Sequence, residues 1–209
     1  MKIVLNILMV ATICLLTYMC VISITTSTNF DKQKKIRDKA ISQRLIDIRS
    51  AQIGFRNVNH HYAGTFEELK KFLNEQKLAY LIKEGNLTDD QLKAGMTEQE
   101  AVKKGLIRRD TTWVLAKDTL LGKNYDVSIL SKVPGFEQIS FKMDTATLSS
   151  QAGYTVPVFE ASVSFDEYLG DLDRQKLINL KDQQKKTNRF LGLRVGSITE
   201  INNNAGNWE

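Results

Sequence analysis

The chain has 209 residues, of which 42% are hydrophobic and 25% are charged, and this balance excludes an intrinsically disordered chain. Its formal net charge of +5 is compatible with binding to nucleic acid or to an anionic membrane, so the distribution of the charge has to decide between them. Both cysteines, Cys14 and Cys20, lie near the start, so the rest of the chain gives no indication of its redox compartment.

The first predicted element is an apolar run, Ile3 to Ile24, that contains no charged side chain. At about 1.5 Å per residue in a helix, its roughly 22 residues match the ~30 Å hydrocarbon core of a bilayer. A cleaved signal peptide is the alternative, but such a peptide ends at small residues, whereas this run has Tyr18, Met19 and Val21 near its end. We therefore predict an uncleaved single-pass transmembrane anchor over residues 1–26.

A group of cations, here called the basic collar, follows the apolar run. Each of them would gain on the order of 1 kcal/mol beside anionic lipid headgroups, so we expect the collar to contact the membrane surface. The collar consists of Lys32, Lys34, Lys35, Arg37 and Lys39. A second basic cluster lacks the interleaved aromatic residues of a nucleic-acid groove and is interpreted as a solvated helix face. That cluster comprises Lys181, Lys185, Lys186 and Arg189.

The orientation of the domain follows from two opposing arguments. The positive-inside rule would place the collar, and the domain behind it, in the cytoplasm. However, a long domain that follows an N-terminal apolar segment is often translocated whatever its charges. We expect translocation, with the anchor in a bacterial inner membrane and the C-terminal domain in the periplasm.

Helical periodicity resumes after the collar and predicts an amphipathic stalk over residues 27–64. The stalk is either continuous with the anchor or separated from it by a break near residues 25–29. Gly64 is expected to end the stalk in a left-handed cap, and Thr65 and Glu68 form a capping box for a second helix. The apolar stripe of the stalk consists of Ile41, Leu45, Ile48, Ala51, Phe55, Val58 and Tyr62.

The remaining residues, 65–209, are predicted to form an α+β globular domain. Residues 85–105 contain two more capping boxes and indicate a surface excursion. From Thr111 onward the apolar residues alternate, which predicts an antiparallel sheet with one apolar face, covered by the long helix. Pro157 is expected at a strand start or an edge, since proline cannot donate to a ladder. A last helix is predicted over residues 166–186, followed by a strand at residues 191–195.

A short part of the sequence resembles the helix end of type IV pilins and of general-secretion pseudopilins. The resemblance covers Ile46-Asp47-Ile48-Arg49-Ser50-Ala51-Gln52, Phe55, Tyr62-Ala63-Gly64-Thr65 and Phe66-Glu67-Glu68-Leu69. It implies an apolar N-terminal helix that continues into an amphipathic half packed on an antiparallel sheet. Pilins also carry a basic leader that ends in glycine and a glutamate as fifth mature residue, and neither occurs here. The resemblance therefore implies a pilin-like envelope subunit that stays in the membrane.

No constellation of catalytic residues stands out in the sequence. His60 and His61 are adjacent, so on a helix they point about 100° apart and form a poor pair of metal ligands. Several carboxylates could pair in space, but no spacing selects two of them. We expect no catalytic, metal or cofactor site and no small-molecule substrate. Asn6, inside the apolar run, and Trp208, near the end of the chain, are candidates for partner contacts, although docking of Trp208 on its own domain is the simpler interpretation.

These observations predict a membrane-anchored structural or assembly subunit of a bacterial envelope complex. Its partners would be the lipid bilayer and other envelope proteins, including a second copy of itself, and not nucleic acid. A scaffold that faces the cytoplasm is the alternative favoured by the collar. A membrane-tethered hydrolase built on dispersed carboxylates is a further alternative.

Overall fold

The computed structural model describes residues 2–84, 88, 91, 93, 95–106, 108–149 and 153–209, apart from the side chains of residues 2, 5, 21–27, 80–84, 98 and 108–110. The chain is α+β and divides into two compact units. Unit 1 comprises Met1–Arg49 and Ser131–Glu209, and unit 2 comprises Ser50–Leu130. The predicted division of the chain at residue 65 stays a prediction.

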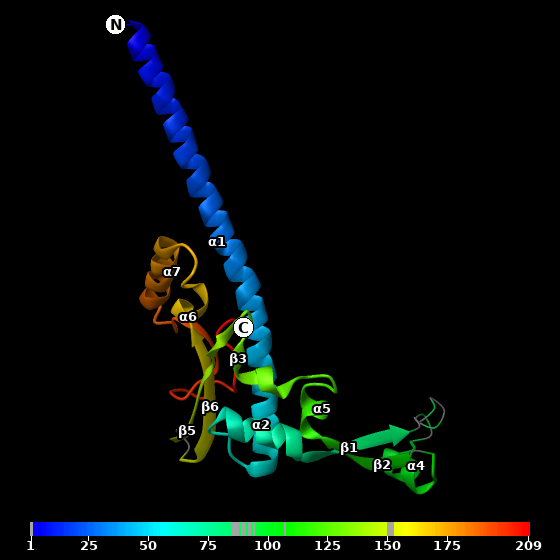
Figure 1. Ribbon diagram of the computed structural model, residues 1–209. Helices are drawn as coiled ribbons and strands as arrows, with labels where there is room; N and C mark the ends of the chain where they lie inside the picture. The colour runs from blue at the N-terminus through cyan, green and yellow to red at the C-terminus, as the bar shows by residue number, and fades with distance from the viewer. Residues whose placement is uncertain are drawn as a thin grey trace. The chain divides into compact units, whose positions relative to one another are not determined.

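A single helix, α1 (Lys2–Asn59), runs through the first part of the chain without interruption (Figure 1). The sequence left open a break near residues 25–29, and the continuous helix excludes it. No proline and no glycine occurs before Gly54, so no residue of the first 50 prevents helical hydrogen bonding. The predicted connection between apolar run and stalk as one helix is therefore confirmed.

Unit 1 contains two antiparallel sheets beside α1 (Figure 1). The larger sheet has the order β5-β6-β7, with β5 (Lys142–Ser149), β6 (Thr155–Ser164) and β7 (Gly192–Gly196). The smaller one pairs β3 (Lys132–Val133) with β4 (Phe136–Ser140). The expected antiparallel sheet and the expected strand at residues 191–195 are thus confirmed.

The register of the larger sheet explains the position of its proline. Strand β6 pairs with β5 from Lys142↔Ser162 to Ser149↔Thr155, and with β7 from Glu160↔Gly196 to Ser164↔Gly192. Pro157 lies opposite Thr147, in the part of β6 that has a named strand on one side only. A residue without an N–H is tolerated there, because a strand edge leaves every second backbone group unpaired.

The core of unit 1 is built from one stripe of α1 and from both faces of β6. Because Val158 and Ser162 of β6 are buried as well as Phe159, Ala161 and Val163, the expectation of a strand with one apolar and one polar face is wrong for β6. The centre of a three-stranded sheet is covered more completely than its alternating sequence suggests. The buried apolar residues are Phe30, Ile41, Leu45, Ile48, Val133, Phe141, Val158, Phe159, Ala161, Val163, Phe165, Tyr168, Leu169, Leu177, Leu193 and Val195.

Two elements predicted as continuous are each divided in the structure. The alternation around Phe141 predicted one strand, but Phe141 is buried between β4 and β5 and its N–H donates to the Ser131 carbonyl (2.9 Å). The predicted helix over residues 166–186 is two helices, α6 (Phe165–Leu169) and α7 (Arg174–Lys186). The Asp173 carboxylate accepts from the Lys176 N–H (2.8 Å), so a new N-cap interrupts a continuous leucine pattern.

Unit 2 begins with the last turns of α1 and continues into α2 (Phe66–Glu75). Strands β1 (Lys77–Glu84) and β2 (Arg108–Leu115) form an antiparallel ribbon, which carries α4 (Glu98–Lys103) between its strands. The helix α5 (Ala116–Leu120) and a 3-10 turn, η1 (Val127–Ser131), follow.

Strand β1 was not predicted, because its apolar run also fits a buried helical turn. The buried apolar residues of unit 2 are Ala51, Phe55, Tyr62, Ala63, Leu69, Phe72, Leu73, Ala101, Ala116, Val127 and Leu130.

The end of α1 differs from the expected cap. The left-handed residue is His60 (φ 64°), whereas Gly64 does not adopt a positive φ. Histidine is one of the non-glycine residues enriched in this conformation, although the conformation costs histidine more energy than it costs glycine. The predicted start of α2 is confirmed, since the Thr65 hydroxyl accepts from the Glu68 N–H (3.2 Å) and Glu68 accepts from the Gly64 N–H (3.0 Å).

A buried amide fixes the segment that follows α1. Gln52 is completely buried, its Nε2 donates to the Ala63 carbonyl (2.9 Å), and its Oε1 accepts from the Ala63 N–H (3.0 Å). The side chain therefore replaces the backbone partners that Ala63 loses when the helix ends. Because both groups lie in the core, leaving them without partners would cost about 1–3 kcal/mol for each group.

We expect Gln52→Leu to lower the free energy of unfolding by about 2–4 kcal/mol, since it leaves a buried N–H and a buried carbonyl without partners. Urea unfolding followed by tryptophan fluorescence measures the change. Gln43→Leu, at an exposed position of the same helix, is the matched control and should stay within about 0.5 kcal/mol of the unsubstituted chain. Equal effects of the two substitutions would contradict the role of Gln52.

We expect His60→Gly to raise the free energy of unfolding by about 1 kcal/mol, because glycine adopts a positive φ without steric cost. The control is His61→Gly, which makes the same chemical change at a residue without a positive φ and should not stabilise the chain. Thermal unfolding of the two variants in parallel compares them. Stabilisation by both, or by neither, would show that the backbone conformation of His60 is not strained.

Candidate functional site

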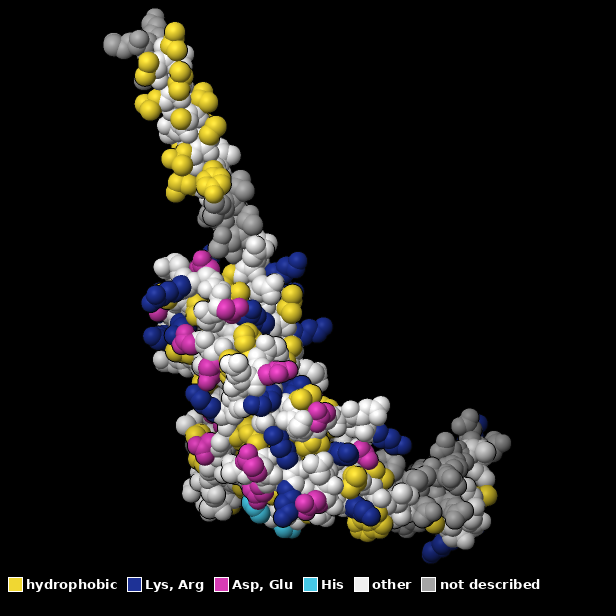
Figure 2. Space-filling model, viewed as in Figure 1, with side chains coloured by type: hydrophobic (Ala, Val, Ile, Leu, Met, Phe, Trp, Pro, Cys, Tyr) yellow, Lys and Arg dark blue, Asp and Glu magenta, His cyan; other side chains and the backbone are white. Residues whose placement is uncertain are grey.

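Every described side chain in the first 20 residues of the chain is exposed, and all of them except Asn6, Thr12 and Thr17 are apolar. Figure 2 shows one face of this apolar surface. The exposed fractions of the large hydrophobic side chains in this stretch lie between 56% and 75%, and the two cysteines, Cys14 and Cys20, are exposed as well. The hydroxyls of Thr12 and Thr17 donate to the carbonyls of Leu8 and Ile13, so their hydrogen bonds are satisfied within the helix. This surface therefore contains almost no polar group that requires water.

The membrane-spanning role of residues 1–26 stays a prediction. Among the described residues, none of the helices offers a stretch of the length and apolarity needed to cross a membrane. Residue 5 and residues 21–24 of the predicted anchor have side chains that lie outside the described residues. Asn6, a candidate for a partner contact, is exposed on α1.

The basic collar lies on α1, between residues 32 and 39, and its members fall into two groups. Lys32, Lys35 and Lys39 are exposed. Lys34 and Arg37 instead contact residues of α6 and of the loop that follows it, which the sequence did not predict. Membrane contact by the collar stays a prediction, and within it the three exposed lysines are the cations most accessible to a surface.

Arg37 joins α1 to the loop between α6 and α7. Its guanidinium donates from Nη1 and Nη2 to the two carboxylate oxygens of Asp171 (2.5 and 2.7 Å) and from Nη1 to the Tyr168 carbonyl (2.6 Å). It also lies 5.0 Å from the centre of the Phe136 ring. A bidentate pair of this kind fixes both distance and orientation. We call Lys34, Arg37, Asp38, Tyr168 and Asp171 the Arg37 cluster.

The second half of the Arg37 cluster centres on Tyr168. Its hydroxyl donates to Asp38 Oδ1 (2.7 Å), and Asp38 Oδ2 accepts from Lys34 (2.5 Å). Lys34 also lies above the Phe165 ring, 5.8 Å from its centre. Burial of Tyr168, together with the Asp38 carboxylate, raises the pKa of the phenol far above its usual range. Tyr168 is therefore a fixed hydrogen-bond donor and not an acid or base near neutral pH.

The ion pair also shifts the pKa of its two members in opposite directions. The hydrogen bonds from Arg37 lower the pKa of Asp171, and the hydrogen bond to Asp171 raises the pKa of Arg37. Both groups are thus held in their charged forms, which suits an electrostatic clamp and not proton transfer. The Asp171 side chain is 55% exposed, so solvent screens much of the interaction.

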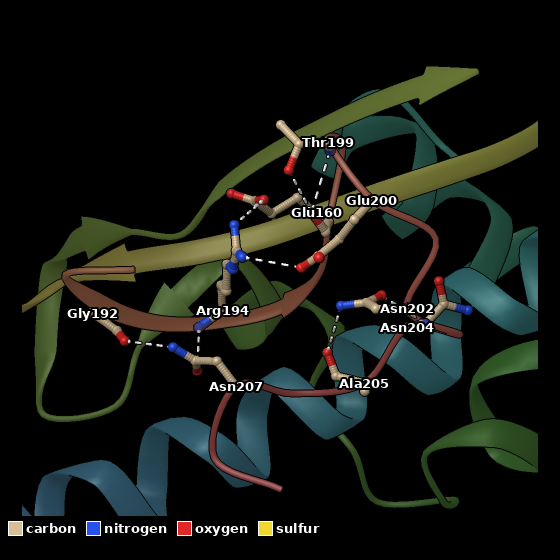
Figure 3. A network of polar contacts seen from close by, with 10 residues as sticks. Glu160, Gly192, Arg194, Thr199, Glu200, Asn202, Asn204, Ala205 and Asn207 are labelled. Carbon is tan, nitrogen blue, oxygen red and sulfur yellow. Dashed lines mark hydrogen bonds and ion pairs between the residues drawn. The ribbon is translucent and has the colours of Figure 1, made fainter. Parts of the chain in front are cut away.

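The end of the chain forms a second polar network in unit 1 (Figure 3). Asn203 and Asn204 both have positive φ, and the Ala205 N–H donates to the Asn202 carbonyl (3.0 Å), which is the pattern of a type I′ turn. After the turn, the Asn207 N–H donates to the Arg194 carbonyl (3.1 Å). The asparagine-rich tail is therefore an ordered turn that returns the chain to the edge of β7.

Side chains hold the returning segment in place (Figure 3). Asn207 Oδ1 accepts from the Arg194 N–H (3.1 Å), and Asn207 Nδ2 donates to the Gly192 carbonyl (2.9 Å). Arg194 itself contacts Glu160 (3.2 Å) and Glu200 (3.5 Å). At the end of the chain, Arg49 of α1 donates to the Glu209 carboxylate (2.7 Å), and this hydrogen bond lowers the pKa of that carboxyl.

Trp208 lies half-buried on its own tail. A Cβ at Gly206 would come within 2.5 Å of the indole ring, so the ring packs directly on this glycine. This position agrees with the simpler interpretation, in which Trp208 docks on its own domain. The contact of Trp208 with a partner stays a prediction.

The remaining candidates do not assemble into a reactive site within the described residues. The ring of His61 stands edge-on to Phe55 and its Nδ1 lies 2.8 Å from the Asn59 carbonyl. No group of three metal-binding side chains occurs among the described residues. Asp89, Asp90 and the side chain of Asp110 lie outside them. Asp166 is paired with Lys181, and Glu167 caps its own helix through Ser164, so both carboxylates have structural partners.

Comparison with known proteins gives no assignment for this arrangement. No protein-family model matches the chain, and no curated protein and no solved structure matches it either.

We expect Asp171→Asn to lower the free energy of unfolding by about 1 kcal/mol at pH 7, because the carboxylate is more than half exposed. Since the pKa of Asp171 is depressed in the folded state, its contribution is present above the unfolded value of about 3.9 and is lost as the pH falls through the folded value. The difference between the two proteins should therefore shrink as the pH falls below about 4. Urea unfolding from pH 2 to 8 tests this, with Asp182→Asn on α7 as the control. A difference of the same size at pH 7 and at pH 2 would contradict an ionic origin.

Proposed function

We propose that this chain is a membrane-anchored structural or assembly subunit of a bacterial envelope complex, with no catalytic activity of its own. The observation that carries the proposal is the exposed apolar surface that surrounds the first part of α1. Water does not favour so large a continuous apolar surface, whereas lipid or another apolar helix does. The predicted anchor, residues 1–26, would place it in the inner membrane.

The way in which α1 continues into unit 1 supports a structural role. The helix that carries the apolar surface also supplies Ile41, Leu45 and Ile48 to the core of unit 1. The Arg37 cluster adds polar contacts between that helix and the α6–α7 loop. A domain attached by a continuous helix, and not by a flexible linker, would stand in a defined orientation on its anchor. Such rigidity suits a subunit that presents surfaces to neighbours.

A pilin-like assignment is part of this proposal. It rests on the resemblance over residues 46–69 and on the combination of one long N-terminal helix with an antiparallel sheet. The subunit would remain in the membrane, its domain would lie in the periplasm, and its partners would be other envelope proteins or further copies of itself. The alternative, a scaffold that faces the cytoplasm, is favoured by the exposed collar lysines Lys32, Lys35 and Lys39.

The anchor is tested by extraction of membranes with alkaline carbonate. We expect the unsubstituted chain to stay with the membranes, and Leu8→Lys with Leu15→Lys to release it. Each charge at the centre of a membrane helix costs roughly 2.5–3.5 kcal/mol on insertion scales. Leu106→Lys with Ile201→Lys, at two exposed positions outside the run, is the matched control and should remain bound. Release of the unsubstituted chain, or equal behaviour of both pairs, would reject the anchor.

Orientation is tested by two reporters fused after Glu209, one active only outside the cytoplasm and one only inside it. We expect activity from the outside reporter. Activity from the inside reporter would reject the periplasmic assignment and would favour the cytoplasmic scaffold.

A further inference from the structure

The positive charge of the chain is concentrated on two helical segments of unit 1. Residues 31–39 of α1 hold the five collar cations against Asp31 and Asp38, a net charge of +3. Helix α7 holds five cations against Asp182, a net charge of +4. Together they exceed the +5 of the whole chain, so the remainder is net negative. The α7 cations are Arg174, Lys176, Lys181, Lys185 and Lys186.

The two basic segments lie close together in unit 1. Asp171 binds Arg37 in the middle of the collar, and α7 begins three residues later at Arg174. Three residues span at most about 10 Å of extended chain, so the start of α7 is held near the collar. Figure 1 shows α7 beside α1 at this level. The Arg37 cluster therefore joins two basic segments into one region.

The exposed face of α7 has the pattern of a helix that lies on a membrane surface. Arg174, Ile178, Lys181 and Lys185 are spaced 4, 3 and 4 and therefore share one face. Ile178 is 41% exposed between these cations, while the neighbouring Leu177 is buried in the core. A basic face that includes an exposed apolar side chain suits the boundary between headgroups and acyl chains.

A shallow pocket of about 340 Å³ lies on this face of α7. Arg174 and Lys181 contribute its charged wall, and Leu177, Ile178 and Gly170 contribute apolar atoms. Asp166 accepts from Lys181 (2.6 and 2.9 Å), which offsets one of the charges. Arg174 and Lys185 form no ion pair with any residue that the structure describes, so these two cations of the face favour an anionic ligand with apolar character.

We propose that α7 is a second membrane contact, which binds anionic phospholipid headgroups beside the collar. This inference rests on the anchor proposed above. Arg37, whose partner Asp171 lies three residues before α7, follows Ile24 by 13 positions, which is about 20 Å along the helix. A headgroup layer of about 5–8 Å and a Debye length of about 8 Å at physiological salt together reach about 13–16 Å, and the long side chains of lysine and arginine can bridge the remainder. The contact would fix the rotation of unit 1 about the anchor, and it replaces the interpretation of this cluster as a solvated face.

The test uses the full chain in vesicles, with Cys14→Ser and Cys20→Ser so that one new cysteine can be labelled. A fluorophore is placed on α7 by Asp182→Cys, or on exposed β5 by Thr147→Cys as the reference position. Lipids that carry a nitroxide on the headgroup quench a fluorophore that lies near the surface. In vesicles of phosphatidylcholine with phosphatidylglycerol, we expect stronger quenching at position 182 than at position 147. Pure phosphatidylcholine, or about 1 M NaCl, should reduce the quenching at position 182 to the reference level.

The surface variant is Arg174→Gln with Ile178→Ser and Lys185→Gln, which leaves the Lys181–Asp166 pair intact. Its matched control is Lys103→Gln with Lys104→Gln and Leu106→Ser, which also removes two exposed cations and one exposed apolar residue. At about fivefold per cation, the surface variant should lower the equilibrium constant for docking of α7, taken from the quenching at position 182, by at least tenfold, and the control should not.

The outcomes separate this inference from the anchor. A chain that floats with the vesicles but shows equal quenching at positions 182 and 147, or equal quenching in the surface variant and the control, overturns the α7 contact alone. A chain that does not float with the vesicles rejects the anchor and the α7 contact with it. Tighter binding of α7 to duplex DNA than to anionic vesicles, both measured in the same buffer, would assign the face to a nucleic acid and overturn the proposal.

Discussion

The structure of unit 1 depends on the burial of one stripe of α1. Phe30, Ile41, Leu45 and Ile48 are buried, and each fully buried side chain of this kind contributes about 1.5–3 kcal/mol relative to exposure. The described side chains in the first 20 residues of the same helix are all exposed, and most of them are apolar. One continuous helix is therefore exposed in its first part and buried along one stripe in its second, which is a change in the surface of the chain. Every functional proposal made above follows from this change.

Polar contacts then determine how the other elements attach to α1. The burial of apolar side chains is strong but has no direction, whereas the bidentate pair of Arg37 with Asp171 and the bond from Tyr168 to Asp38 fix angles as well as distances. Arg49 has a similar function at the end of the chain, where it holds Glu209. In unit 2, Gln52 provides the directional contact through two hydrogen bonds to Ala63. One partner of each of these contacts lies on α1, namely Arg37, Asp38, Arg49 or Gln52.

The combination of a rigid helix and charged segments gives the proposed role its physical basis. An apolar segment alone would anchor the chain but would leave unit 1 free to rotate. A second contact through α7 would remove that freedom, because the collar and α7 are joined through Asp171. Restricting rotation before assembly lowers the entropy that neighbouring subunits have to overcome when they bind. A structural subunit would gain from such an arrangement, whereas an enzyme would require convergent reactive groups.

Local patterns allowed the helices and most strands to be predicted. The stripe of the stalk predicted the buried face of α1 correctly from Ile41 to Phe55, and the Thr65 capping box predicted the start of α2. Errors occurred where a tertiary contact overrides a pattern. Phe141 interrupts an alternating run because its side chain is buried and its N–H donates to the Ser131 carbonyl, and Asp173 interrupts a leucine periodicity because it caps α7. His60, and not Gly64, ends α1, because the path of the chain to Ala63 is fixed by Gln52.

The sequence by itself determined the apolar run, the basic collar, the helical character of both segments and the α+β class, since all of these depend on composition and on contacts a few residues apart. The structure then decided that the two segments form one continuous helix. Only the tertiary structure decided that Arg37 binds Asp171, that the asparagine-rich tail is a turn on the edge of β7, and that the basic face of α7 lies near the collar. The reason is that these contacts join residues more than 100 positions apart, or depend on the left-handed conformation of single residues. Periodicity describes the face of an element, but it carries no information about which distant element meets that face.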